Sequence, residues 1–120
     1  MAVKVYVRTP DGFVHREQAA YERLSGVRSS HLGRLHVRQL LDCFQIQQHT
    51  GDRHICLVYQ PLQTTMLDLQ RLGGSARPFP EGLVKEALRY LLKALDFLHV
   101  DADIAHCGRT PIQFALIYGC

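Results

Sequence analysis

Residues 37–62, VRQLLDCFQIQQHTGDRHICLVYQPL, contain two apolar runs joined by a short polar segment. Each run has the length and the aliphatic and aromatic content of a β-strand. Gly51 and Asp52, in the segment between them, are residue types that favour a turn. A connection this short joins antiparallel neighbours, so the sequence predicts a β-hairpin. Pro61 ends the second strand, because proline has no backbone N–H to donate to a strand ladder.

The segment before the hairpin reads as a strand, a turn and a helix. The stretch AVKVYV, from Ala2, is short and β-branched, which is typical of a strand, and TPDG at 9–12 favours a turn after it. Between residues 14 and 25, one face of a predicted helix carries Glu17, Ala20, Tyr21 and Leu24, at i, i+3, i+4 and i+7. A carboxylate on such a face either reaches solvent at its edge or pairs with a cation.

The segments on the two sides of the hairpin differ in their predicted structure. Residues 27–36, before the hairpin, are polar and turn-like, whereas 64–72 predict a short helix and 73–82, rich in Gly and Pro, a linker. A long helix is predicted from Leu83 to Leu98, where apolar residues cover about half the circumference, wider than the ~100° stripe of a surface helix. Such a helix needs neighbours on two sides, so the pattern implies another protein that covers helix 83–98, aggregation or partial disorder.

Composition limits the classes of function. The 120 residues suffice for one domain, and the net charge of +3 comes from 14 basic and 11 acidic residues spread along the chain. No basic block with interleaved aromatics is present, so no nucleic-acid partner is expected. No apolar run approaches the ~20 residues of a membrane span, and no signal-peptide core follows Met1. We therefore expect no membrane association and an intracellular protein, cytoplasmic or nuclear.

Cysteines and histidines do not form a metal-binding pattern. The four cysteines are too scattered for a CxxC pair, so no structural metal is expected. Cys43 and Cys56 lie inside apolar runs and are expected to act as small hydrophobic residues. Most of the seven histidines are expected on the surface or in loops.

Four segments, in this order, resemble a eukaryotic protein kinase domain, with the closest likeness to fungal relatives of the SR-protein-specific serine/threonine kinases. They are AVKV (2–5), HREQAAYERLS (15–25), the hairpin with its end (40–62) and LLKALDFLHVDADIAH (91–106). The resemblance implies an α+β fold: an antiparallel small-lobe sheet of about three strands with one helix, then the hinge and first helices of the large lobe. It divides the chain into a partial small lobe with hinge, 1–62, and the start of the large lobe, 63–120, truncated at the catalytic loop.

The resemblance also implies ATP and magnesium as cofactors, and an ATP site made by Ala2, Lys4, Glu17, Tyr59, Gln60 and Leu62. Lys4 would hold the α- and β-phosphates while paired with Glu17. Ala2 would line the adenine slot, Tyr59 would gate its back, and the backbone of Gln60 and Leu62 would offer an acceptor and a donor to the adenine edge. The alternatives are a surface lysine with an unrelated helix acid, and a core tyrosine, whose hydroxyl still needs a partner.

The catalytic loop departs from the family pattern. His106 and Pro111 match it, but Gly108, Thr110 and Gln113 stand where the family has its catalytic aspartate, a lysine and a magnesium-binding asparagine. A glycine-rich hairpin before Ala2 and an Asp-Phe-Gly segment are not found in this sequence. Losing a positioned base typically costs ~10²–10⁴ in rate, and a lone amide is a poor magnesium ligand.

We therefore expect a serine/threonine kinase-like, ATP-binding domain fragment that is catalytically inactive as written, without a catalytic residue at position 108 and without a metal site of its own. Two alternatives stay open: a non-catalytic module that binds nucleotide or protein, and a truncated gene product without independent function. A misassigned splice boundary near His106 is a further hypothesis for the departures after it.

Overall fold

The structure is a computed structural model, and it describes residues 1–7, 15–62, 64, 66–72 and 78–105. The chain divides into two units. The first comprises Met1–Val27 and Arg38–Pro61, and the second comprises Arg28–Val37 and the residues from Leu62 onward. Residues 28–37 thus group with the second unit, although they precede the hairpin in sequence. The predicted domain division at residue 62 stays a prediction.

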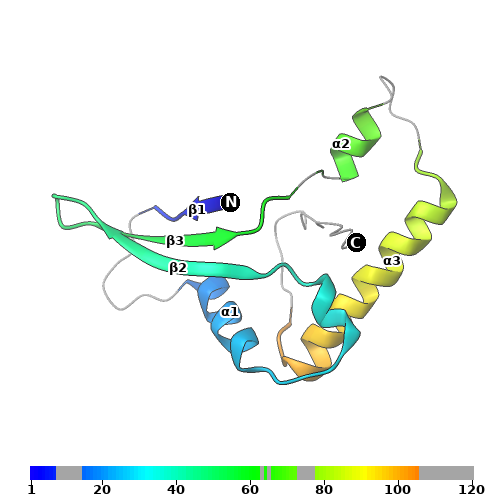
Figure 1. The fold of residues 1–120 in the computed structure, drawn as a ribbon, viewed down its shortest axis with the longest axis horizontal. Coiled ribbons are helices and arrows are strands. Elements are labelled where there is room, and N and C mark those ends of the chain that lie inside the picture. The colour runs from blue at the N-terminus through cyan, green and yellow to red at the C-terminus, as the bar shows by residue number, and fades with distance from the viewer. Residues whose placement is uncertain (8–14, 63, 65, 73–77, 106–120) are drawn as a thin grey trace. The chain divides into compact units, whose positions relative to one another are not determined.

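A three-stranded antiparallel sheet forms the first unit (Figure 1). Its strands are β1 (Ala2–Val5), β2 (Leu40–Gln47) and β3 (Arg53–Tyr59), and β3 lies between the other two. The predicted hairpin is therefore confirmed, as is the α+β fold with about three small-lobe strands and one helix. Because β1 pairs with β3, the first strand in sequence lies beside the third, which is the central strand of the sheet.

The hairpin turn follows the sequence signal closely. The Gly51 N–H donates to the Gln48 carbonyl at 2.9 Å, and the Gln48 N–H donates to the Asp52 carbonyl at 2.9 Å. Gly51 has φ +86°, in the left-handed region that a residue with a Cβ rarely adopts. The turn thus needs glycine at this position.

The core of the first unit lies on β3. Ile55, Leu57 and Tyr59 alternate along the strand on one face, each at most 3% exposed, and the half-buried Tyr6, Tyr21 and Leu40 pack against them. Tyr21 belongs to α1 (Arg16–Gly26), where the predicted helix face, Glu17, Ala20, Tyr21 and Leu24, is half-buried as expected.

The two cysteines of the hairpin differ in exposure. Cys56, on the central strand, is fully buried, as a small hydrophobic residue would be. Cys43 is exposed on the outer strand β2, so it does not pack as the small hydrophobic residue that the sequence predicted. An outer strand has a neighbour on one edge only, and an apolar run in sequence does not reveal which strand is central.

Helices form the second unit: η1 (Leu32–His36, a 3₁₀-helix), α2 (Met66–Arg71), α3 (Glu81–Asp96) and η2 (Phe97–Asp101, a π-helix). The long and the short helix were both predicted, but η1 replaces the turn expected at 27–36. It packs against α3. On α3, Leu83, Ala87 and Leu91 are half-buried while Val84, Leu88 and Leu92 are exposed, so the wide apolar surface has one covered and one open stripe.

Within the described part of the chain, none of the helices is both long enough and apolar enough to span a membrane.

Candidate functional site

Lys4 and Glu17 form an ion pair between β1 and the first turn of α1. The Lys4 ammonium donates to Glu17 Oε2, although the two residues are 13 positions apart in sequence. Lys4 lies opposite Leu57 of β3, so its backbone is fixed by the ladder while its side chain, 52% exposed, reaches the helix. The predicted meeting of this ammonium and this carboxylate is confirmed.

Two tyrosines hold the same carboxylate. The Tyr6 hydroxyl also donates to Glu17 Oε2, and the Tyr59 hydroxyl donates to Oε1 at 2.6 Å. Tyr59 is only 3% exposed, so its hydroxyl needed a partner inside the fold, and Glu17 is that partner. Tyr59 is therefore a core residue with a satisfied hydroxyl, and its role in an adenine slot stays a prediction.

The pKa shifts describe one charged cluster. Burial raises the pKa of Glu17, but the hydrogen bonds from Lys4, Tyr59 and Tyr6 together outweigh it, and the pKa lies below its ordinary 4.5. Burial lowers the pKa of Lys4, while the hydrogen bonds with Glu17 and Tyr6 move it above 10.5. Burial and then the bond to Glu17 raise the pKa of Tyr59. At neutral pH, Glu17 is an anion, Lys4 a cation and Tyr59 a neutral donor.

This arrangement can present a cation to an anionic ligand. If the Lys4 ammonium turns toward such a ligand, the two tyrosine hydroxyls still satisfy the Glu17 carboxylate. A carboxylate left without donors in a half-buried place would oppose that movement. The tyrosines thus lower the cost of sharing Lys4 with a ligand, and no sequence signal pointed to Tyr6 in this role.

An arginine that the sequence did not single out contacts the ring of Tyr59. The Arg38 guanidinium lies 4.3 Å from the centroid of the Tyr59 ring, and Tyr21 lies 5.7 Å away, ring to ring. Arg38 Nη2 also donates to the Gln60 carbonyl at 2.9 Å. An arginine just before an apolar strand is common in sequences, so only the folded hairpin reveals these contacts.

The remaining predicted site residues are placed as follows. Ala2 lies directly opposite Tyr59 in the β1–β3 register and is half-buried. Gln60 follows β3 with an exposed side chain, whereas Leu62 belongs to the second unit. The catalytic-loop positions from His106 to Gln113, including Gly108, lie outside the described residues. Among the residues that are described, no group of three or more His, Cys, Asp or Glu side chains could hold a metal ion.

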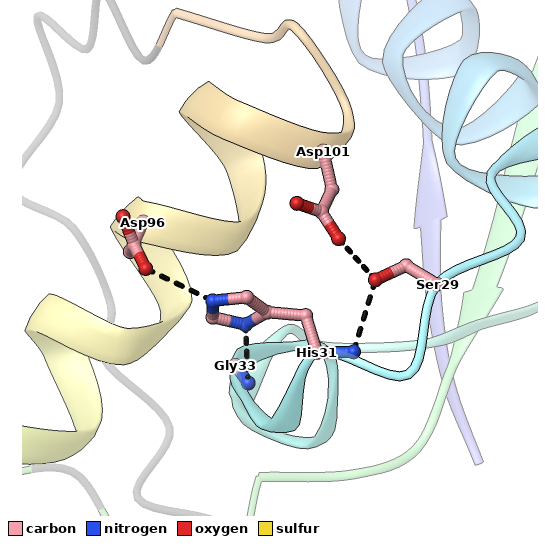
Figure 2. A network of polar contacts seen from close by, with 5 residues as sticks. All are labelled: Ser29, His31, Gly33, Asp96 and Asp101. Atoms are coloured by element: carbon pink, nitrogen blue, oxygen red, sulfur yellow. Dashed lines mark hydrogen bonds and ion pairs between the residues drawn. The ribbon is translucent and has the colours of Figure 1, made fainter.

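A second polar cluster lies in the second unit (Figure 2). The Ser29 hydroxyl donates to the Asp101 carboxylate and accepts from the His31 N–H at 2.9 Å. His31 Nδ1 accepts from the Gly33 N–H at 2.9 Å, so Nε2 carries the hydrogen and donates to Asp96 Oδ2 at 2.9 Å. The cluster ties the start of η1 to α3 and η2, a structural role that the sequence pattern did not indicate for His31.

Comparison with known proteins gives a consistent set of relatives. No family model matches the chain. A serine/threonine protein kinase of Aspergillus fumigatus is 39% identical over 108 residues, which cover 88% of this chain and 26% of that protein. Protein kinase dsk1 of Schizosaccharomyces pombe is 37% identical over 81 residues, 68% of this chain and 14% of the relative.

The serine/threonine-protein kinase SRPK of Physarum polycephalum is 38% identical over 77 residues, which cover 62% of this chain and 17% of the relative. The chain thus spans about a quarter or less of the length of these relatives. Together with the kinase-like sheet and helix, these matches identify the chain as a homologue of one segment of the serine/threonine protein kinases, SR-protein kinases among them.

Proposed function

We propose that the first unit forms part of an ATP-binding cleft of the protein kinase type, with Lys4 as its phosphate-binding cation. The observation that carries this proposal is the Lys4–Glu17 ion pair, completed by the hydroxyls of Tyr6 and Tyr59. In protein kinases, a strand lysine paired with a helix glutamate holds the α- and β-phosphates of ATP. The relatives, which are protein kinases by name, support the same assignment.

The proposal also assigns roles in binding the adenine base and magnesium. Ala2, opposite Tyr59 on the neighbouring strand, would leave room for a flat adenine ring. The Gln60 carbonyl would accept from the donor of the adenine edge. Magnesium would accompany the nucleotide, but Gln113 replaces the family's asparagine ligand. The residues present therefore do not match the family's magnesium site.

We also propose that this polypeptide, as written, does not transfer phosphate. Gly108 stands at the position of the catalytic base, and its side chain can neither orient a hydroxyl nor accept its proton. Losing such a base typically costs ~10²–10⁴ in rate. An ADP-release assay is expected to give the same background rate for the wild-type chain and for Lys4→Met. Faster release by the wild type would overturn the proposed inactivity but not the proposed nucleotide binding.

Nucleotide binding is tested by thermal melting with and without magnesium ATP. A ligand that binds only the folded form stabilises it, by about 2.7 kcal/mol at roughly 100 times its Kd. We expect the melting temperature of the wild type to rise and that of Lys4→Met to rise far less. Lys85→Met is the matched control, because Lys85 forms an exposed ion pair with Glu81 on α3, away from β1 and α1 in sequence. An unchanged wild-type midpoint, or equal shifts in wild type and Lys4→Met, would refute the proposal.

A second candidate function, binding another protein through α3, is supported by one observation. Val84, Leu88 and Leu92, spaced four residues apart, are 37%, 50% and 64% exposed and form an apolar stripe along the helix. Charged substitutions at Leu88 and Leu92 would abolish association through this stripe. Sedimentation of the purified chain tests a second copy as the partner, and identical masses for wild type and Leu88→Lys at all concentrations would exclude it.

A further inference from the structure

Arg38 makes the contacts that a positioning residue for a ligand would need. Its guanidinium lies against the Tyr59 ring, 4.3 Å from the centroid, and its Nη2 donates to the Gln60 carbonyl at 2.9 Å. Its Nε is buried and has no hydrogen-bond partner in the described part of the chain. Burying a guanidinium N–H without a hydrogen bond is costly, and contact with the aromatic ring offsets part of that cost.

The hydrogen bond from Arg38 to Gln60 lies just beyond the end of the strand ladder. The registers of both outer strands against β3 end at Tyr59, paired with Ala2 on one side and Leu40 on the other. Gln60 is the first residue beyond the ladder, so its carbonyl direction is no longer set by strand pairing. Arg38, two residues before Leu40, supplies a charge-assisted hydrogen bond at that point.

The same arginine also acts on the charged cluster. The Tyr59 ring contacts both Arg38 and Tyr21, and the Tyr59 hydroxyl donates to Glu17 Oε1 at 2.6 Å. Holding the ring therefore aims the hydroxyl at the carboxylate that pairs with Lys4. One side chain thus fixes both the carbonyl after β3 and the tyrosine beside it.

We propose that Arg38 is a positioning residue for the base end of the nucleotide site, an inference that rests on the proposed ATP-binding function. It holds the Gln60 carbonyl so that one lone pair accepts from the guanidinium and the other is left for the exocyclic amino group of a purine. A backbone carbonyl has two lone pairs, so both bonds can exist together. Arg38 therefore acts on recognition of the base, whereas Lys4 acts on the phosphates.

The affinities for ATP and for tripolyphosphate distinguish the role of Arg38 at the base from the role of Lys4 at the phosphates. Isothermal titration is carried out on the full chain with ATP, which has a base, and with inorganic tripolyphosphate, which has only the phosphate charge. For Arg38→Ala we expect ATP affinity to fall about tenfold and tripolyphosphate affinity to change less than about twofold, since a hydrogen bond to a charged group is lost only at the base end. For Lys4→Met we expect both affinities to fall. Arg71→Ala, which removes an exposed arginine of α2, is the charge-matched control and should change neither.

Arg38→Lys provides the second variant if Arg38→Ala does not fold. Lysine keeps the charge but lacks the planar group that lies on the ring and bonds the carbonyl at once, so we expect at least a threefold loss confined to ATP. Equal losses for ATP and tripolyphosphate, or no loss for either, would overturn the role of Arg38 alone. Absence of any binding by the wild-type chain would refute the proposed function, and this inference with it.

Discussion

The Tyr59 hydroxyl donates a hydrogen bond to Glu17 Oε1 at 2.6 Å, which joins the last residue of β3 to the first turn of α1. Lys4 and Tyr6 occupy the other oxygen of the same carboxylate. The carboxylate is thus held from two strands, and the helix that carries it cannot shift along the sheet without breaking bonds to both. This relationship makes the ion pair part of the packing of the first unit.

Removing the Tyr59 hydroxyl should therefore destabilise the fold. For Tyr59→Phe we expect the free energy of unfolding to fall by about 1.5 kcal/mol, within the range for hydrogen bonds to charged groups. Tyr21→Phe is the matched control, since Tyr21 packs in the same cluster and no hydrogen bond of its hydroxyl is seen among the described residues. Urea unfolding of both variants measures the difference, and equal losses would show that the Tyr59–Glu17 bond contributes nothing.

The stability of the chain should depend on pH through Glu17. Its pKa is lowered in the folded state, so its contribution is present above the ordinary 4.5 and is lost as the pH falls through the lower folded value. Lys4, whose pKa is raised, contributes below 10.5 and loses that contribution at higher pH. Between pH 4.5 and pH 10.5, both Glu17 and Lys4 contribute to the stability of the fold.

Melting curves from pH 7 down to pH 3 test this dependence. The difference in melting temperature between the wild type and Glu17→Gln is expected to be constant near neutral pH. It should become smaller below pH 4.5, because the variant has no carboxylate to protonate at position 17. Glu81→Gln, which removes an exposed carboxylate at the start of α3, controls for general acid effects. A gap that stays constant down to pH 3 would contradict the assigned pKa direction.

Gly33 and Gly82 should respond in opposite ways to the same substitution. A Cβ on Gly33 would lie 1.9 Å from the Lys93 carbonyl oxygen of α3, so Gly33→Ala must push η1 away from the helix. We expect a loss of more than about 2 kcal/mol, as for overpacking in a close contact. Gly82→Ala meets open space on α3 and should be neutral or stabilising, by up to about 1 kcal/mol. Thermal unfolding of both variants checks the pair, and a stable Gly33→Ala would refute the close packing of η1 on α3.

Ser29 and Ser30 offer a similar comparison in the second unit. The Ser29 hydroxyl bonds Asp101 and accepts from the His31 N–H, whereas Ser30 is exposed. Ser29→Ala should cost about 1 kcal/mol, since it leaves the His31 N–H without its acceptor, and Ser30→Ala should cost much less. Hydrogen exchange at the His31 amide provides a direct measurement. Unchanged protection of that amide in Ser29→Ala would show that the bond is not formed in solution.

Elements that depend on local chemistry follow from the residue pattern. Gly51 in the hairpin turn, the apolar run of β3 and the helical spacing of Glu17, Ala20, Tyr21 and Leu24 each have a short-range cause, so the hairpin and α1 could be predicted. The pairing of Lys4 with Glu17 followed only from the resemblance to kinases, because residues 13 positions apart have no local reason to meet.

Contacts between residues far apart in sequence depend on how the whole chain folds. Arg38 reaches Tyr59 and Gln60, and Ser29 reaches Asp101, 72 positions away, through packing that no periodicity encodes. The exposure of Cys43 was likewise set by strand order, since β2 is an outer strand and β3 the central one. Local patterns fix the conformation of a segment, whereas the partners of its side chains depend on where the whole chain brings the other segments.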